Sequence, residues 1–157
     1  MEKSICENNK IGVILFDFGG VLSEEGWKKG LRVIAEANYL NADSFIQTAA
    51  DTVYETGFIT GKGSEIDFWN TLRKKIGIKG DNASLTNELM SRFVLNDRMI
   101  DLVKKLKSEK LTVGILSDQT NWLDQLNARF DFSNILTMFL IVTTWERENE
   151  MFHCLMT

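Results

Sequence analysis

The sequence predicts an α/β fold in which an open parallel sheet carries an inserted bundle of helices. Two short, continuously apolar runs, 11–17 and 111–117, have the composition of strands buried on both faces. Each run ends in polar residues that precede a turn or a helix, as strands do in open α/β sheets. Roughly eighty residues of helical pattern lie between the runs, too many for one crossover connection, so most of them must form a separate helical unit.

The elements follow in order along the chain. The run IGVILFD (11–17) is followed by Gly19-Gly20, which predicts a strand that ends in a tight turn. Apolar residues at helical spacing then predict five helices. Their stripes are Trp27, Leu31, Ile34 and Ala35; Ile46, Ala49, Ala50, Val53 and Tyr54; Phe68, Trp69, Leu72 and Ile76; Leu85, Leu89 and Phe93; and Met99, Leu102, Val103 and Leu106.

Local signals mark where some of these elements begin and end. Gly57 is suited to follow the last turn of the second helix. Ser64 with Asp67 resembles a capping box at the start of the third. The run LTVGILS (111–117) predicts the second strand, and 121–129 predicts the helix that follows it.

Composition excludes several classes of protein. The 157 residues carry 18 Lys and Arg against 22 Asp and Glu, a net charge of −4, and no basic run, which argues against nucleic acid or an anionic membrane as a partner. The apolar stretch 135–142 is shorter than the ~20 residues that cross a bilayer. The N-terminus MEKSICENNK lacks the apolar core of a signal peptide, so we expect a cytoplasmic protein. Cys6 and Cys154 lack metal-ligand spacing.

Polar residues that could bind a ligand or take part in catalysis lie at both predicted strand ends. Asp17 precedes a Gly-Gly turn, and a carboxylate there can face a ligand together with backbone N–H groups, as a nucleophile would. It can equally do no more than cap the turn. Ser117-Asp118 ends the second strand and can serve either as ligand groups or as an ordinary N-cap. Gly19-Gly20 does not complete the G-x-G-x-x-G pattern of a dinucleotide-binding domain.

Taken together, these segments resemble the haloacid dehalogenase-like (HAD) hydrolases. ILFDFGGVLSEEG (14–26) resembles the first motif of that family and VGILSDQTNWLDQL (113–126) the second. FITGKGSEIDFWNTL (58–72) resembles the helical cap that one subfamily inserts after the first motif. The resemblance covers 11–132 and implies a Rossmannoid parallel-sheet core, incomplete, of residues 11–21 and 95–157, with a helical-bundle cap of residues 22–94.

The resemblance also implies roles for individual residues. Asp17 would be the nucleophile that forms an aspartyl intermediate, and it would bind Mg²⁺ together with the backbone carbonyl of Gly19. Ser117 would hydrogen-bond the transferring phosphoryl group, and Gly20 and Asp118 would contribute to phosphate binding. The implied substrate is a small phosphorylated metabolite.

One departure from the family pattern concerns proton transfer. Phosphatases of the family carry a second aspartate, the general acid and base, where this chain has Gly19. Such assistance is worth about 10²–10⁴-fold in rate. Glu24 or Glu25 could substitute, or both could be acids placed favourably in the first turn of a helix. Dehalogenases and a phosphonate-cleaving branch of the family also lack this acid, so the leaving group stays open.

A second departure concerns the C-terminal region. The family's third motif is a lysine and its fourth is one or two acids at a strand end, but no lysine follows Lys110 and no strand ends in paired acids. Neither Arg129 nor Arg147 can be assigned the lysine's role, and His153 has no evident partner. If the codons for residues 145–150 are read one base earlier, the genetic code permits a glycine followed by a basic run. This motivates the hypothesis that the chain is a C-terminally truncated copy, frameshifted near residue 136.

These departures set the expectations for function. We expect a Mg²⁺-dependent phosphatase that is weak or inactive in this form, or alternatively a non-catalytic binding module or a dehalogenase-type hydrolase. With the core incomplete, the first strand would become an exposed apolar edge at which chains self-associate. Trp27, Phe68 and Trp69 could face the substrate, although aromatic residues at helical spacing are more often core.

Overall fold

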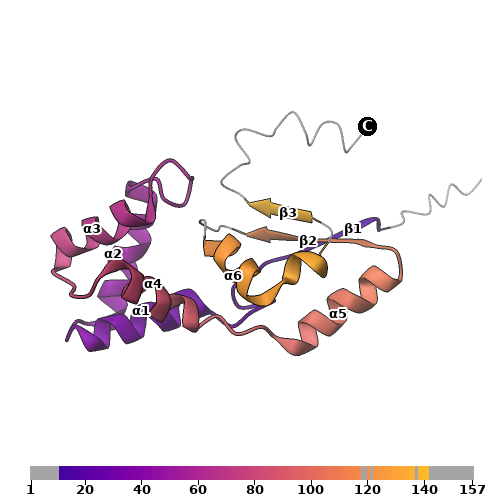
Figure 1. Ribbon diagram of the computed structural model, residues 1–157, viewed down its shortest axis with the longest axis horizontal. Helices are drawn as coiled ribbons and strands as arrows, with labels where there is room; N and C mark the ends of the chain where they lie inside the picture. The colour runs from indigo at the N-terminus through magenta and orange to yellow at the C-terminus, as the bar shows by residue number, and fades with distance from the viewer. Residues whose placement is uncertain (1–10, 118–119, 121, 137, 142–157) are drawn as a thin grey trace, which may run out of the picture.

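The computed structural model describes residues 11–117, 120, 122–136 and 138–141. A parallel sheet lies beside a cluster of helices (Figure 1). In chain order the elements are β1 (Val13–Phe16), α1 (Gly26–Ala37), α2 (Ala42–Glu55), α3 (Glu65–Ile76), α4 (Asn82–Ser91), α5 (Asp97–Ser108), β2 (Thr112–Ser117), α6 (Trp122–Phe130), the 3₁₀ turn η1 (Phe132–Asn134) and β3 (Met138–Ile141).

The sheet has the order β1-β2-β3, and both pairings are parallel. Val13 pairs with Thr112 and Phe16 with Ile115, while Ser117 pairs with Ile141. The two strands that the apolar runs predicted are therefore confirmed as neighbours. The sequence did not predict β3, because a four-residue apolar run without flanking turn signals does not distinguish a strand from a buried helical segment.

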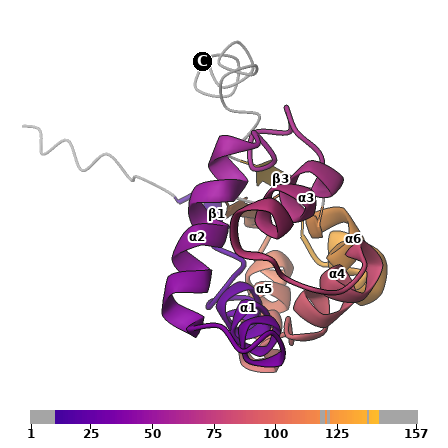
Figure 2. The ribbon, with the colours of Figure 1, turned by 90° about the vertical axis from the view of Figure 1, so that its left-hand side faces the viewer.

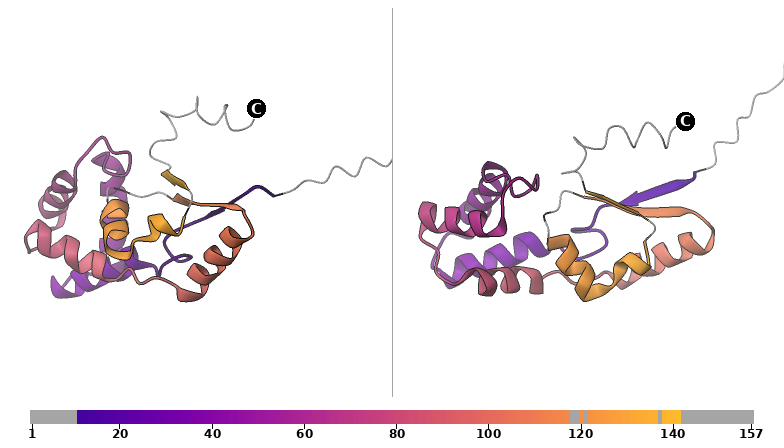
Figure 3. Two further views of the ribbon diagram at one scale, coloured as in Figure 1. Left: turned by 45° about the vertical axis from the view of Figure 1, so that its right-hand side comes forward. Right: turned by 45° about the horizontal axis from the view of Figure 1, so that its top comes forward.

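Helices cover one face of the sheet. α5 and α6 lie below the strands in the right-hand view of Figure 3. Val113 and Ile115 of β2 are fully buried, and Ile14 and Phe16 of β1 share their face through the strand register. The opposite face is apolar and more open, with side chains of β1 among the exposed large hydrophobic residues. The sheet is thus buried on one side, unlike a complete parallel sheet.

The first four helices form a bundle at one end of the molecule (Figure 2). Each predicted stripe supplies buried residues, among them Leu31 of α1, Val53 of α2, Leu72 of α3 and Leu89 of α4. Two stripe members are exposed instead. Tyr54 and Leu102 lie at the edges of their stripes, where a helix turns from its packed face to solvent.

The predicted helix signals are present. Ser64 and Asp67 form a reciprocal capping box at the start of α3. Gly57 follows the C-cap of α2 with φ of 68°, the left-handed conformation that favours glycine there. None of the described helices has the length and apolar character that a membrane span requires.

Two chain segments connect the bundle to the sheet, and they run side by side. The Glu24 amide donates to the Val94 carbonyl at 2.8 Å, and the Asn96 amide donates to the Leu22 carbonyl at 2.9 Å. An antiparallel bridge joins Ser23 to Leu95 between them. The expected division of the chain into core and cap, near residues 22 and 94, falls at this pairing and stays a prediction.

Candidate functional site

The structure brings Asp17 and Ser117 into contact, although a hundred residues separate them. Asp17 follows the last residue of β1, and Ser117 is the last residue of β2. The Ser117 hydroxyl donates a hydrogen bond to Asp17 Oδ1 at 2.7 Å. Parallel pairing of the two strands causes this meeting, because their carboxyl ends lie at one edge of the sheet.

The Asp17 carboxylate is oriented by its own turn as well. The Phe18 amide donates to the same oxygen, Oδ1, at 2.7 Å. The Phe18 ring is fully buried, with ring centroids 5.9 Å from Phe93 and 5.3 Å from Phe132. Within the described residues, both hydrogen bonds of the carboxylate therefore end on Oδ1, and Oδ2 remains for a ligand.

The turn after Asp17 is closed by backbone hydrogen bonds. The Ser23 amide donates to the Phe18 carbonyl at 2.9 Å, and Gly19 forms an isolated bridge with Ser23. Gly20 has φ of 78°, a conformation that a side chain disfavours. The turn thereby places Gly19 with Asp17 in the lining of one pocket, and Gly20 follows directly behind them.

The two glutamates of this segment point to different places. Glu24 is exposed and forms an ion pair with Lys29. Glu25 lines the same pocket as Asp17, and a Cβ built on Gly20 would lie 3.7 Å from Glu25 Oε2. Between the two candidates that the sequence leaves open, only Glu25 lies where it could meet a ligand.

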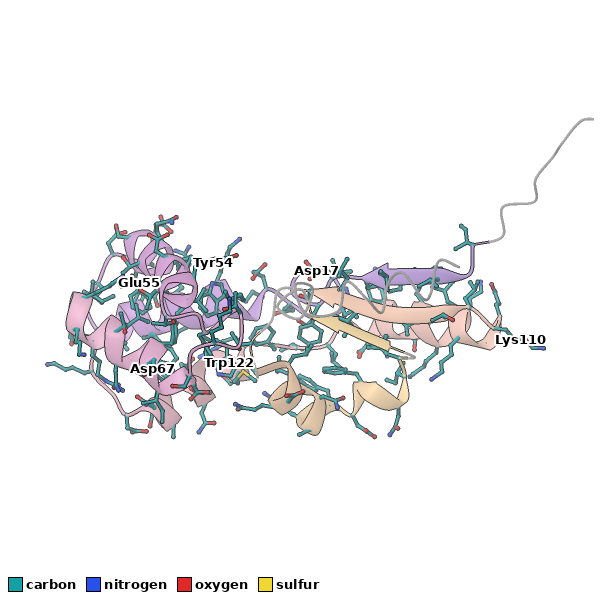
Figure 4. The ribbon with its side chains drawn as sticks, turned by 90° about the horizontal axis from the view of Figure 1, so that it is seen from above. Asp17, Tyr54, Glu55, Asp67, Lys110 and Trp122 are labelled. Atoms are coloured by element: carbon teal, nitrogen blue, oxygen red, sulfur yellow. The ribbon has the colours of Figure 1, made fainter. Side chains whose placement is uncertain are left out.

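A pocket of about 500 Å³ opens between the strand ends and the helical bundle. In Figure 4, Asp17 lies at the strand end, with Tyr54 and Trp122 on its helical side. The lining residues are Asp17, Gly19, Glu25, Trp27, Ala50, Val53, Tyr54, Ile59, Phe93, Leu116, Ser117, Thr120 and Trp122. Of the aromatic candidates, Trp27 lines the pocket, while Phe68 and Trp69 are fully buried in the core.

The charged side chains that line the pocket are all acidic among the described residues. The described lining residues include the carboxylates of Asp17 and Glu25 and no lysine or arginine. The described residues contain no cluster of three or more His, Cys, Asp or Glu side chains that could hold a metal. Asp118, an expected phosphate ligand, lies outside the described residues. Residues 142–157, which include Arg147, His153 and most of the tail after the hypothesised frameshift near residue 136, also lie outside them.

One wall of the pocket is held by a hydrogen-bond relay that the sequence did not reveal. The Trp122 indole donates to Glu65 Oε2 at 2.6 Å, and the Thr86 hydroxyl donates to Glu65 Oε1 at 2.6 Å. Thr86 in turn accepts from the Trp69 indole at 2.9 Å. These residues come from α6, α3 and α4, and no sequence pattern links positions so far apart.

Arg129 packs between two helices, away from the pocket lining. Its guanidinium donates to the Met90 carbonyl at 3.2 Å and lies 4.9 Å from the centroid of the Phe130 ring. Arg129 is also absent from the pocket lining. In the described structure it joins α6 to the end of α4.

The fold is similar to solved structures of HAD enzymes. The HAD family enzyme BT-2542 from Bacteroides thetaiotaomicron superposes with a TM-score of 0.63 and 19% identity, over 85% of this chain and 69% of that one. The same enzyme has been solved in complex with magnesium and inorganic phosphate (TM-score 0.56, 19% identity, 85% of this chain and 70% of that one). The L-2-haloacid dehalogenase from Xanthobacter autotrophicus, with chloropropionic acid covalently bound, gives a TM-score of 0.56 at 15% identity.

These comparisons show the fold, an α/β core of the HAD-like type with a helical cap. The match to the Xanthobacter enzyme covers 85% of this chain and 57% of that one. A substantial part of each solved protein therefore has no counterpart in the matched region. No protein-family model and no curated protein sequence matches the chain.

Proposed function

We propose that this chain, which has the HAD-like fold, is a hydrolase that transfers a phosphoryl group from a small phosphate ester to Asp17. The observation that carries the proposal is the hydrogen bond from Ser117 to Asp17 Oδ1. It brings a carboxylate and a hydroxyl to one point at the carboxyl ends of adjacent parallel strands, where ligands of open α/β sheets bind. The pocket beside them has the size of a small-molecule site.

The geometry supports defined roles for the residues. Asp17 Oδ2 would attack phosphorus and form an aspartyl phosphate, while the hydrogen bonds to Oδ1 fix the orientation of the carboxylate. When substrate binds, the Ser117 hydroxyl would donate its hydrogen bond to a phosphoryl oxygen instead of to Asp17. The backbone of Gly19 lines the same pocket, and neither Gly19 nor Gly20 has a side chain of its own that would keep the turn from a phosphoryl group. Positioning of this kind supplies much of the catalysis of phosphoryl transfer.

Magnesium fits the donor set that the pocket offers. The Asp17 carboxylate and the Gly19 carbonyl are both hard oxygen donors. Mg²⁺ is commonly held by only one or two carboxylates, with substrate phosphate and water completing the shell, so a cluster of three acids is not required. When bound, the ion would neutralise phosphoryl charge that no described lysine or arginine of the lining offsets.

The lining also restricts the organic part of the substrate. Trp27, Tyr54 and Ile59 face the pocket on the bundle side. Aromatic and aliphatic surface favours an apolar or aromatic group, and the described lining has no lysine or arginine to offset a second anion there. We therefore assign the substrate to phosphate monoesters whose alcohol carries no further negative charge.

A dehalogenase is the second candidate, and Gly19 is the observation that favours it. Displacement of a halide by Asp17 needs no proton for the leaving group, so a glycine at that position costs nothing. Against it stands the carboxylate of a haloacid, which would enter a lining whose described residues include two acids and no lysine or arginine.

The test compares phosphate release from benzyl phosphate with halide release from 2-chloropropionate. We expect phosphate release that requires Mg²⁺, stops with EDTA and falls to the background rate in Asp17→Asn. The control is Asp101→Asn, since Asp101 is exposed on α5 away from the pocket. Halide release that depends on Asp17 would instead establish the second candidate. A folded protein that releases neither product would overturn both and leave a binding module.

A further inference from the structure

Cleavage of an alkyl phosphate needs a proton for the departing oxygen, and the turn after Asp17 has no side chain to give one. Gly19 occupies the position two residues beyond the nucleophile. Among the described lining residues, the side chains with an ionisable proton are Asp17, Glu25 and Tyr54. Asp17 is committed to attack, and Tyr54 is 63% exposed on the far side of the pocket from β1. Glu25 is the remaining acid.

The Glu25 carboxyl lies across the Gly19-Gly20 turn. A Cβ built on Gly19 would be 4.0 Å from Glu25 Oε1, and a Cβ built on Gly20 would be 3.7 Å from Glu25 Oε2. One Glu25 carboxyl oxygen thus borders the volume that a side chain at position 19 would enter, and the other borders the volume at position 20. The carboxyl comes from the far end of the loop and approaches the space that glycine leaves open.

The backbone position of Glu25 at the start of α1 is closely packed. Glu25 is the N-cap residue of α1, yet its side chain makes no capping hydrogen bond. The next residue, Gly26, packs against the Phe93 ring so closely that a Cβ would lie 2.4 Å from it. Glu24 is turned outward to Lys29. A side chain at an N-cap position that does not cap is available for another purpose, and here it lines the pocket of Asp17.

We infer that Glu25 is the proton-transfer group for the reaction at Asp17, an inference that rests on the proposed function. In the first step, an Asp17 oxygen bonds to phosphorus, the bond from phosphorus to the ester oxygen breaks, and that oxygen takes the proton of the Glu25 carboxyl and leaves as an alcohol. In the second step, Glu25 takes a proton from water as the water oxygen bonds to phosphorus. The bond to Asp17 breaks, which releases phosphate and restores both carboxyl groups.

The first experiment varies the leaving group. Benzyl phosphate must release an alkoxide that needs a proton, whereas 2,4-dinitrophenyl phosphate releases a stable anion that needs none. We expect Glu25→Gln to lower the rate of Asp17 phosphorylation by benzyl phosphate by about 10²–10⁴-fold and to change the burst of dinitrophenolate by less than about threefold. Glu24→Gln is the matched control, and both rates should be unchanged in it because Glu24 is paired with Lys29 outside the pocket.

The second experiment restores an acid from the other side of the same space. A Cβ fits at Gly19, whose φ is not positive and whose nearest contact would be the Glu25 carboxyl itself. We expect the double variant Gly19→Asp/Glu25→Gln to be phosphorylated by benzyl phosphate at least tenfold faster than Glu25→Gln alone. Rescue by an acid at a different backbone position is a result that a purely structural role for Glu25 would not produce.

The outcomes separate this inference from the function on which it rests. A dinitrophenolate burst that depends on Asp17, together with equal benzyl phosphate rates in wild type and Glu25→Gln, would overturn the role of Glu25 and leave the proposed function standing. No burst from folded wild-type protein would overturn both. A loss of Mg²⁺ affinity above about tenfold in Glu25→Gln, measured by calorimetric titration, would make Glu25 a metal ligand and overturn proton transfer.

Discussion

Gly19 and Gly20 are adjacent in the turn after Asp17, yet they carry different constraints. Gly20 has φ of 78°, in the left-handed region, and Gly19 does not. The space around both is open, since the nearest atoms to a built Cβ belong to the flexible Glu25 side chain. Only Gly20 is therefore required for its backbone conformation, and a substituent at Gly19 is compatible with the turn.

We predict that Gly20→Ala lowers the free energy of unfolding by about 1–3 kcal/mol, the cost of a residue held in a disfavoured backbone region. Gly19→Ala is the matched variant and should lie within about 0.5 kcal/mol of wild type. Urea unfolding followed by tryptophan fluorescence measures both. Equal losses in the two variants would show that crowding, rather than backbone strain, governs this turn.

The capping box of α3 makes one element sensitive to acid. The Ser64 hydroxyl donates to Asp67 Oδ2 at 2.6 Å and the Ser64 amide donates to the same oxygen at 3.1 Å. Hydrogen bonds from the Ser64 side chain, and then from its backbone, hold the pKa of the Asp67 carboxyl below its ordinary value. The resulting stabilisation is present above the unfolded-state pKa of that carboxyl and is lost as the pH falls through its lower folded-state pKa.

We predict that Ser64→Ala raises the pKa of Asp67 toward its ordinary value and weakens this acid dependence. A carboxyl-detected NMR titration measures the pKa, and acid unfolding followed by circular dichroism measures the stability. Ser84→Ala is the control, because the Ser84 hydroxyl donates to Asp81 Oδ2 and its loss should change the pKa of Asp81 alone. An Asp67 titration that does not move in Ser64→Ala would contradict the assignment.

The Glu65 relay joins elements rather than neighbours along one helix. Its carboxylate accepts from the Trp122 indole of α6 and the Thr86 hydroxyl of α4. Trp122 is 3% exposed and Thr86 4%, so removing their acceptor leaves two nearly buried donors unsatisfied. The relay therefore contributes to the packing of the cap against the core.

We predict that Glu65→Ala destabilises the protein by about 2–4 kcal/mol, as expected when buried donors lose a charged acceptor. Ile66→Ala, next to it on α3 and 59% exposed, should cost less than about 0.5 kcal/mol. Chemical unfolding gives both values, and hydrogen exchange should show faster opening of α6 in Glu65→Ala. If Glu65→Ala lost no more free energy of unfolding than Ile66→Ala, the relay would not contribute to the stability of the fold.

At the scale of the whole molecule, the described sheet ends on one side at β1. β1 is one of the two outer strands of the described sheet, and its side chains Val13 and Leu15 are 51% and 38% exposed. Ile11 and Leu116 extend this apolar surface. An outer strand with exposed apolar side chains and unpaired backbone groups is a site where a second chain can pair.

We predict that the protein self-associates through β1 and that Leu15→Lys, which places a charge on this surface, shifts it to the monomer. Light scattering after size exclusion, over a range of concentrations, measures the mass. Lys28→Ala is the control, since Lys28 is exposed on α1 in the cap. A wild-type protein that stays monomeric at all concentrations would contradict the prediction.

Much of this protein could be predicted from local sequence patterns. The apolar runs identified β1 and β2, the helical stripes identified all six long helices, and Ser64 and Gly57 marked helix ends. The positions of Asp17 and Ser117 at strand ends also followed from those runs. Such features depend on residues within a few positions of one another, where backbone preference and periodicity suffice.

The tertiary structure decided the rest. It selected Glu25 over Glu24 for the pocket, placed Trp27 there and Phe68 in the core, and joined Glu65 to Trp122. Adjacent glutamates have the same propensities, so only the packing of Gly26 on Phe93 and the pairing of Glu24 with Lys29 distinguish them. Sequence patterns report which face of an element is buried, whereas the partners across that face are set by how distant segments pack together.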